Sequence, residues 1–291
     1  MTEPAFNKVV IFGVGLIGGS FALALRKAEA VGEVVGFGRT KATLKKALEA
    51  DIIDRIGDDV ESEVSDADLV LLAVPVAQMA DIFTQIAPHL GKDTLVTDGG
   101  STKSDVVAAA RANLGDKIGQ FVPAHPIAGA EASGPAAAQE DLYLGKKVVL
   151  TPLQENDNDM LIRACAAWEA CGAQIERLSP EQHDDVFAAV SHLPHMLAFA
   201  LVHDLAQRDN HKLLLSFAAS GFRDFTRIAA SSPEMWRDIC LANRDALLRE
   251  MRQYADELFA MYEALESRDA VRLEEIFRQA SEVRGDWSPK Q

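Results

Sequence analysis

Short apolar runs, each followed by a turn or an amphipathic stretch, recur along the first part of the chain. The β-branched run at 8–12 comes first and leads through a glycine-rich turn into a helical pattern. Runs of this length predict buried strands, and the amphipathic stretches between them predict helices. The predicted strands are 8–12, 33–37, 69–74, 94–97, 146–150 and 173–178, and the predicted helices are 21–27, 41–50, 76–89 and 157–171. Such alternation predicts an α/β fold with a doubly wound parallel sheet.

The pattern becomes helical almost throughout after Ser179-Pro180. Ser179 is typical of an N-cap, and Pro180 is typical of the first helical position. Helices are predicted at 180–205, 213–217, 224–230, about 233–265 and 270–283. We therefore predict a Rossmann-type dinucleotide-binding domain at 1–179 and a helical domain at 180–291. Because the helical part is rich in Leu, Ala, Phe and Met, it is expected to form the interface of a homodimer.

The charge of the chain excludes some classes of partner. Its 291 residues include 29 Lys and Arg against 44 Asp and Glu, which gives a net charge of −15. Nucleic acid and anionic membranes would be repelled, so an anionic ligand needs a locally basic pocket. No apolar run approaches the roughly 18 residues of a membrane span, and no basic secretory signal is present. The three cysteines lack metal-ligand spacing, which predicts reduced thiols, no metal site and a cytoplasmic protein.

The turn after the first predicted strand reads Gly13-Val-Gly15-Leu16-Ile17-Gly18. Glycines at this spacing permit a sharp turn, close approach to a pyrophosphate and close packing of helix on strand. Free N–H groups at the start of the helix would face the phosphates. The position of the motif between a strand and a helix predicts dinucleotide binding, and the alternative is a glycine-rich turn without a ligand.

The second predicted strand ends in Gly38-Arg39-Thr40. An NAD-specific fold usually places Asp or Glu here to accept a hydrogen bond from the ribose 2′-OH. Gly38 leaves room for a 2′-phosphate, which Arg39 and Thr40 can bind. This favours NADP over NAD. The alternative is an exposed Arg39 in an enzyme that accepts both cofactors.

Two further segments are expected near the nicotinamide. The strand at 69–74 ends at Val74-Pro75, and ligands of such sheets lie beyond the carboxyl ends of the strands. The loop at 98–104 contains Ser101-Thr102 and opens a helix. Either hydroxyl is a candidate N-cap of that helix, and the competing role is a hydroxyl that points into the cleft.

The segment 124–134, Ala-His-Pro-Ile-Ala-Gly-Ala-Glu-Ala-Ser-Gly, holds His125 in a restricted turn. Pro126 fixes its own φ and biases His125 toward an extended conformation. Gly129 and Gly134 permit backbone that other residues resist. The segment is suited to aim the imidazole, and the alternative is a histidine that ends a strand and bonds its neighbours.

A polar stripe marks the helix after Pro180. Asp184, Ser191 and His195 share one face through spacings of 4, 3 and 4 residues with Ala188 between them. Pro194 is expected to bend the helix and open a site just before His195. The alternative is a core histidine satisfied by Ser191.

Two arginines stand beside aromatic residues in Gly221-Phe-Arg-Asp-Phe-Thr-Arg227, with Trp236 farther along. For Arg223 a solvated helix face is the better interpretation. Arg227 lies in an apolar turn and is the candidate to bind a carboxylate.

The chain resembles the prephenate/arogenate dehydrogenases of tyrosine biosynthesis from Lys8 to about Val283. The matching runs are GVGLIGGS, TDGGSTK, AHPIAGAEASG, SHLPH and GFRDFTRIAASSPEMW. The resemblance implies a Rossmann domain with a helical dimerisation domain. It also implies oxidative decarboxylation of a cyclohexadiene, prephenate or alternatively arogenate, with hydride transfer to NAD(P)⁺.

The resemblance also implies roles for single residues. The histidine matching His125 takes the proton of the ring hydroxyl as hydride leaves the same carbon. Ser101 matches a serine that bonds this hydroxyl or orients His125, and His195 matches a second histidine that contacts substrate.

Further substrate-binding positions carry over in the same way. Arg227 matches the arginine that binds a substrate carboxylate. Asp184, Ser191 and Trp236 match positions in the pocket wall or its support, and Glu131 matches a position that lines or gates the pocket. The chain shows neither a mutase domain nor a ligand-sensing domain, so any tyrosine feedback is expected to act at the active site.

Two rival functions stay open from the residues alone. A β-hydroxyacid dehydrogenase also joins a Rossmann domain to helices, but it usually relies on an interdomain lysine, and no lysine lies between Lys147 and Lys212. A catalytically silent NADP sensor would not need His125, Ser101 and the helical-domain residues to converge.

Overall fold

The structure is a computed structural model that describes residues 4–129, 132 and 134–287. The chain forms two compact units, Met1–Arg244 and Asp245–Gln291, and each is described by itself. The boundary predicted at Pro180 lies inside the first unit, where the sheets give way to helices. All three cysteines are free thiols.

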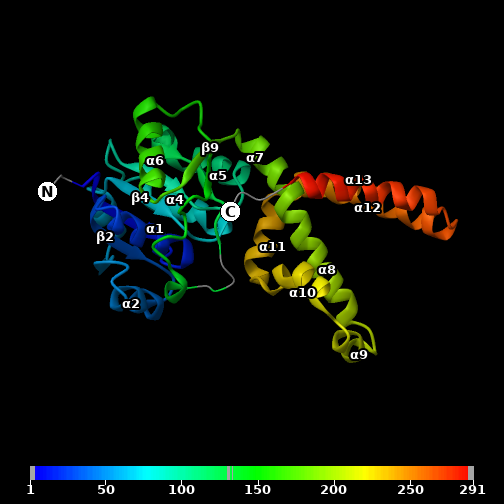
Figure 1. Cartoon of the computed structure of the whole chain (residues 1–291). Coiled ribbons are helices and arrows are strands. Elements are labelled where there is room, and N and C mark those ends of the chain that lie inside the picture. Colours follow the sequence, from blue (N-terminus) through cyan, green and yellow to red (C-terminus); the bar gives the residue numbers. More distant parts are fainter. Residues whose placement is uncertain (1–3, 130–131, 133, 288–291) are drawn as a thin grey trace. The chain divides into compact units, whose positions relative to one another are not determined.

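A parallel sheet organises the first unit and confirms the predicted fold class (Figure 1). Its strands are β1 (Phe6–Phe12), β2 (Val31–Phe37), β3 (Arg55–Ile56), β4 (Leu69–Leu72), β5 (Leu95–Asp98) and β6 (Phe121–Val122). They lie in the order β3-β2-β1-β4-β5-β6, so the strand order reverses between β1 and β4. A crevice at such a reversal is where doubly wound sheets bind ligands.

Helices cover both faces of this sheet, and successive side chains of β1 point alternately into the two cores that result. Val9 and Ile11 join the core under α1 (Leu16–Lys27) and α6 (Asn158–Ala170). Val10 and Phe12 join the core under α4 (Met79–Ile86) and α5 (Ser104–Leu114). The remaining helices of this region are α2 (Lys41–Glu49) and α3 (Val60–Val64), with 3₁₀ segments at Val76–Gln78, Gly115–Gln120 and Pro135–Ala137.

A second, mixed sheet corrects the expectation that the later strands simply complete the first sheet. Its strands are β7 (Ala124–Pro126), β8 (Lys147–Leu150) and β9 (Gln174–Arg177), in that order. β7 pairs antiparallel with β8, and His125 stands opposite Val149. His125 therefore lies in a short strand, which fixes the direction of its side chain more firmly than a turn would.

The helical run after Ser179 is continuous from Pro180 to Ala206 but changes its winding. It consists of α7 (Pro180–Phe187), a π-helical segment (Ala188–His192) and α8 (Leu193–Ala206). The Leu193 N–H donates to the Ala188 carbonyl, five residues back, and Pro194 follows in the first turn of α8. The extra residue in this wide turn places the His192 side chain on the buried side of the helix. The predicted polar stripe had instead placed Ser191 on the same face as Asp184.

This helical run is the one helix among the described residues that is long and apolar enough to cross a membrane. Its most apolar window of 18 residues has a mean hydropathy of 1.5 and is 22% buried. The sequence-based expectation that no apolar run approaches 18 residues is therefore wrong for this helix. Length and composition alone do not assign it to a membrane, because helices of soluble proteins pass the same test.

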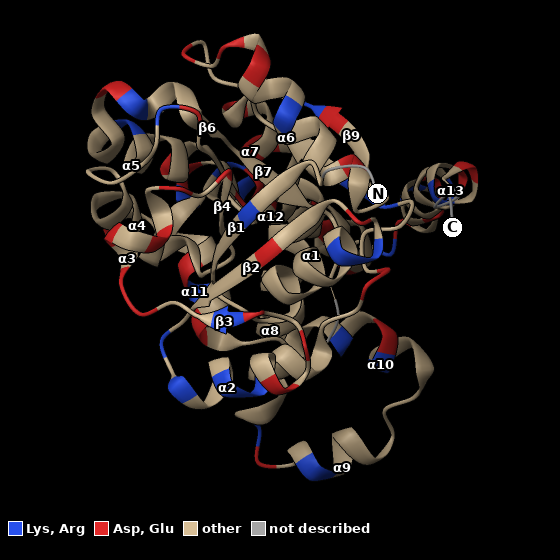
Figure 2. Ribbon diagram, turned by 90° about the vertical axis from the view of Figure 1, so that its left-hand side faces the viewer, with Lys and Arg blue, Asp and Glu red and all other residues tan. Residues whose placement is uncertain are grey.

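The rest of the first unit contains α9 (His211–Ser216), α10 (Ser220–Thr226), a 3₁₀ segment (Arg227–Ala230) and α11 (Pro233–Ala242). The single helix expected at 233–265 is wrong, because α11 ends at Ala242, Asn243 is its C-cap, and α12 (Arg244–Glu266) begins after it. Acidic and basic residues are interspersed along the elements (Figure 2).

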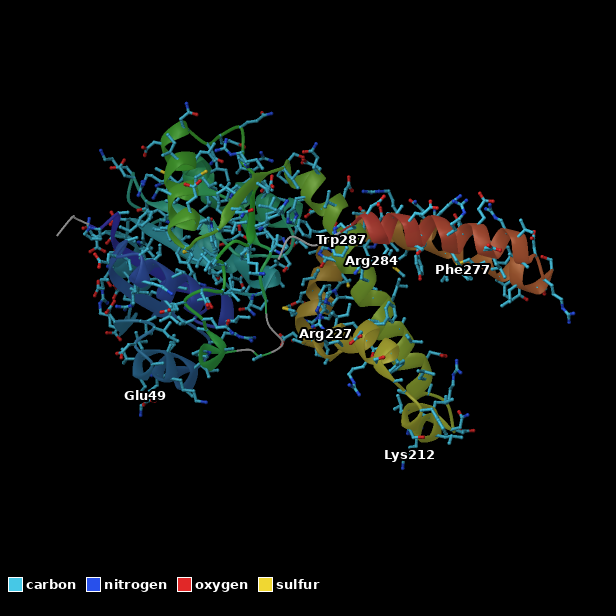
Figure 3. All side chains as sticks on the ribbon, viewed as in Figure 1. Glu49, Lys212, Arg227, Phe277, Arg284 and Trp287 are labelled. Atoms are coloured by element: carbon cyan, nitrogen blue, oxygen red, sulfur yellow. The ribbon has the colours of Figure 1, made fainter. Side chains whose placement is uncertain are left out.

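The second unit is a pair of helices, α12 and α13 (Ala270–Asp286), that lie side by side (Figures 1 and 3). Large apolar side chains stay exposed on it, among them Phe259 and Phe277. An apolar surface of this kind is typical of a helix face that another chain covers.

Candidate active site

The turn between β1 and α1 has the form that a dinucleotide requires. Gly13 has φ +97°, and a Cβ there would clash with the Ala73 carbonyl, while a Cβ on Gly18 would clash with the Gly13 carbonyl. Gly15 instead faces open space and provides no side-chain cap to α1. The first N–H groups of α1 are thus left for a bound anion, and the turn fits a pyrophosphate.

A cavity of about 590 Å³ connects this turn to the helical region of the same unit. It is lined by predicted cofactor residues and predicted substrate residues together: Gly15, Leu16, Ile17, Arg39, Pro75, His195 and Arg227. Its size falls in the range of ligand sites for small molecules. Val74 packs beside Gly13 at the rim of the turn.

The His125 side chain contacts a second histidine, His183. Its Nδ1 lies 2.8 Å from Nε2 of His183, and the Phe187 ring packs 4.8 Å from its own ring, centroid to centroid. Burial lowers the pKa of His125 well below 6.5, and the positive charge of Lys103 lowers it further. The imidazole is therefore neutral at pH 7.

His183 was missed by sequence reasoning, although it adjoins Asp184. The His183 ring is fully buried, and its Nδ1 lies 2.8 Å from Oδ1 of Asp184. The Asp184 carboxylate also accepts the N–H groups of Lys103 and Ser104, each at 2.8 Å. Burial alone would raise the pKa of Asp184, but the hydrogen bonds from His183 and Ser104 lower it below its usual value.

These contacts settle how α5 begins. The N-cap position is Lys103, without a side-chain cap of its own, and Asp184 satisfies the first N–H groups from across the site. The interpretation of Ser101 or Thr102 as the N-cap is therefore wrong. The capping carboxylate lies 81 residues along the chain from Lys103, so no local signal could indicate it.

Asp98, at the end of β5, ties the Ser101 loop to the His125 strand. Its carboxylate accepts the N–H of Gly100 at 2.8 Å and the N–H of Ala124 at 2.9 Å. It also pairs with the ammonium group of Lys103, and both side chains are fully buried. Sequence reasoning assigned no role to this pair.

His192 braces the same loop from the π-helical segment. It forms a hydrogen bond with the Ser101 backbone, and the Asn243 amide lies 3.1 Å from its Nδ1. Asn243 also donates to the Asp184 carbonyl at 2.7 Å. Burial lowers the pKa of His192 to about 4. Neither His192 nor Asn243 was a predicted site residue.

His195 lies flat against the Trp236 indole, with ring centroids 3.6 Å apart and an interplanar angle of 20°. Its Nδ1–H donates to the Ser191 carbonyl at 2.8 Å, so Nε2 is the nitrogen left for a ligand. Burial lowers the pKa of His195, and the charge of Arg227 acts in the same direction. The structure thus joins the predicted partner Ser191 to a histidine that also lines the cavity.

Arg227 opens the 3₁₀ segment after α10 and lines the cavity with an exposed side chain (Figure 3). Arg223, one turn earlier, is exposed and does not line it. The Arg39 guanidinium stands 3.8 Å from Glu234 of α11. The hydroxyl of Thr40 caps α2 by accepting from the Thr43 N–H.

Glu131 lies outside the described residues. In the part of the chain that the structure describes, no group of three or more His, Cys, Asp or Glu is arranged to hold a metal ion.

The comparisons with known proteins agree with this geometry. The family model for the prephenate dehydrogenase nucleotide-binding domain matches residues 21–177, and the model for the prephenate dehydrogenase dimerization domain matches residues 179–279. The chain belongs to the prephenate dehydrogenase family. The resemblance read from the motifs is thereby confirmed, and family membership displaces the hydroxyacid dehydrogenase alternative.

Relatives align over nearly the whole chain. Prephenate dehydrogenase of Bacillus subtilis is 38% identical over 281 residues, covering 96% of this chain and 75% of the relative. Cyclohexadienyl dehydrogenase of Zymomonas mobilis is 34% identical, covering 96% of this chain and 95% of the relative.

Solved structures give the same result. The prephenate dehydrogenase of Aquifex aeolicus, in complex with hydroxyphenyl propionate and NAD⁺, superposes with a TM-score of 0.90 at 37% identity and covers 96% and 98% of the two chains. Arogenate dehydrogenase of Synechocystis superposes with a TM-score of 0.81 at 29% identity and covers 97% and 100%.

Proposed function

We propose that this protein converts prephenate to 4-hydroxyphenylpyruvate and CO₂, with hydride transfer to a nicotinamide cofactor, in tyrosine biosynthesis. The observation that carries the proposal is the cavity that joins the dinucleotide turn to His195 and Arg227 in a chain that matches both family domains. The alternative substrate is arogenate, alone or together with prephenate, since one relative is named a cyclohexadienyl dehydrogenase.

The residues divide the work by their chemistry. The glycine turn and the N-terminus of α1 hold the cofactor, which when bound supplies the hydride acceptor. His125, neutral at pH 7, accepts the proton of the ring hydroxyl as the carbon that carries this hydroxyl gives its hydride to the cofactor. The bond to the ring carboxylate then breaks, its electron pair flows through the ring to the oxygen, and that oxygen takes the proton back from His125. The ring becomes aromatic and CO₂ leaves.

Charge recognition falls to the helical side of the cavity. Arg227 lines the cavity and presents a guanidinium suited to a carboxylate. Nε2 of His195 points away from its Ser191 bond and can contact the substrate beside Arg227. Ser101 is proposed to orient the ring hydroxyl toward His125, because His192 and Asp98 brace its loop. Asp184, Ser191 and Trp236 support this wall.

NADP is the proposed preferred cofactor. No carboxylate follows β2 at Gly38, and Arg39 lines the cavity with an exposed guanidinium. Thr40 is the weaker candidate of the two, because its hydroxyl already caps α2. The measurement is kcat/KM with NADP against NAD for the wild type and Arg39→Ala. A preference for NAD in the wild type, unchanged by Arg39→Ala, would remove Arg39 from cofactor binding.

A homodimer through the helical domain at 180–291 is proposed as the working form. The match to a family dimerization domain supports it, and so do the exposed apolar residues of α12 and α13. The helical run Pro180–Ala206, with only 22% of its apolar window buried, adds surface that a second copy would cover. Sedimentation velocity of the full chain tests it, and a monomer at micromolar concentration would contradict it.

The substrate proposal is tested by a two-by-two assay of prephenate or arogenate with NAD or NADP. We expect turnover of prephenate, read as reduced cofactor at 340 nm. Turnover of arogenate alone would select the alternative. Turnover of neither substrate would overturn the assignment.

A further inference from the structure

We propose that His183 is a positioning residue that, together with Asp184, fixes which nitrogen of His125 carries the proton and leaves Nε2 free to accept one. This inference rests on the proposed role of His125 as the proton acceptor. It adds a residue that contacts the His125 ring and that, like His125 itself, is not among the residues lining the cavity at Gly15, His195 and Arg227.

The first step is the protonation of Asp184. Its carboxylate accepts two backbone N–H groups, from Lys103 and Ser104, and meets His183 Nδ1 through Oδ1. All these contacts use oxygen as the acceptor, and together they hold the pKa of Asp184 below its usual value. The carboxylate is therefore ionised, and His183 Nδ1 must supply the hydrogen between them.

The second step follows from the neutral state of His183. Burial lowers its pKa, so the ring carries one proton at pH 7, and that proton is on Nδ1. Nε2 of His183 then has a lone pair, and it lies 2.8 Å from His125 Nδ1. His125 must donate from Nδ1 across this contact, because two lone pairs at that distance would repel. The other nitrogen of His125, Nε2, is left unprotonated.

The third step concerns the charge that develops in the reaction. When His125 takes a proton at Nε2, its Nδ1–H bond to His183 strengthens, and the ionised Asp184 beyond His183 stabilises the cation. The positive charge of Lys103 opposes this, and Asp98 offsets Lys103 through their buried pair. In known acid–base triads a carboxylate orients the catalytic imidazole directly. Here the Asp184 carboxylate acts on His125 through His183, which lies between them.

Two neighbours constrain the alternatives. Phe187 packs on both imidazoles, 4.8 Å from the His125 ring and 4.5 Å from the His183 ring, centroid to centroid, and provides no hydrogen-bond partner. His192 also lies near His125 electrostatically, but its own ring is occupied by Asn243 and the Ser101 backbone. Among the residues that the structure describes, His183 is the hydrogen-bond partner of the His125 side chain.

The test compares His183→Met with His183→Gln. Methionine keeps the size and replaces the nitrogen acceptor with a weakly accepting sulfur, whereas glutamine offers an amide oxygen near the position of Nε2. We expect kcat to fall by roughly 100-fold in His183→Met and to recover at least tenfold in His183→Gln. KM for substrate and the Kd of the cofactor should stay within about threefold, because His183 lies outside the cavity. The matched control is His89→Met, a partly exposed histidine after α4 that does not line the cavity, and it should keep wild-type kinetics.

A purely structural role would change these readouts differently. Loss of fold or of cofactor binding in both variants, with no recovery in His183→Gln, would count against positioning. The deciding readout is the ¹⁵N spectrum of histidine-labelled wild type, which reports the tautomer without turnover. We expect the Nδ1–H tautomer at His125, and the Nε2–H tautomer would overturn the inference even if the enzyme is active. An enzyme inactive on both substrates that still shows Nδ1–H would refute the proposed function and leave the positioning pair standing.

Discussion

The buried His192 predicts a specific loss of stability at acid pH. Its pKa is about 4 in the folded chain, against about 6.5 for an unfolded histidine. Between these values the unfolded state binds the proton and the folded state does not, so the free energy of unfolding falls as pH falls. From pH 7 to pH 5 the loss from this one residue amounts to about 2 kcal/mol, and it approaches 3 kcal/mol near pH 4.

The assay is urea unfolding of the wild type and His192→Gln at pH 7 and pH 5. Glutamine does not titrate, so any packing loss it causes is the same at both pH values. The wild type should therefore lose about 2 kcal/mol more than the variant over this interval. Equal losses in the two proteins would mean that His192 titrates normally. The claim that His192 is buried and holds the Ser101 loop would then fail.

Two further changes test separate parts of the site. Arg227→Ala should raise the KM for prephenate roughly tenfold with little change in kcat, because it removes a charged hydrogen bond that binds substrate and transition state alike; an unchanged KM would argue against the carboxylate contact. Gly13→Ala should abolish measurable cofactor binding in calorimetry, because φ is +97° and the new Cβ would clash with the Ala73 carbonyl. An unchanged Kd would refute the role of this turn, and Gly221→Ala, where the Cβ meets open space away from the cavity, is the matched control.

Local patterns predicted much of the fold. The β1 turn and α1 follow from adjacent residues, and so does the change to helix at Ser179-Pro180, where the structure forms a full capping box. The break at Asn243 was not predictable, because its amide is recruited by His192 and the Asp184 carbonyl, which are distant in sequence. The separate second sheet likewise depends on pairing between distant segments.

The site was predicted in the same uneven way. His195 and Arg227 were found from their local context, and both line the cavity. His183 was not found, because a histidine beside an aspartate on a helix gives no signal until a strand 58 residues away brings His125 to it. Regular helical periodicity also placed Ser191 on the buried face of the helix, where the structure has His192. The π-helical turn contains one extra residue, and this rotates every later position around the helix axis.

The central claim is that His125 accepts the hydroxyl proton. The most direct measurement is the kcat of His125→Asn with prephenate and saturating cofactor, beside the Kd of the cofactor. We predict a fall in kcat of roughly 100-fold or more with an unchanged Kd, because asparagine keeps hydrogen bonding and cannot take the proton. A turnover close to that of the wild type would contradict the account and remove His125 from the chemistry.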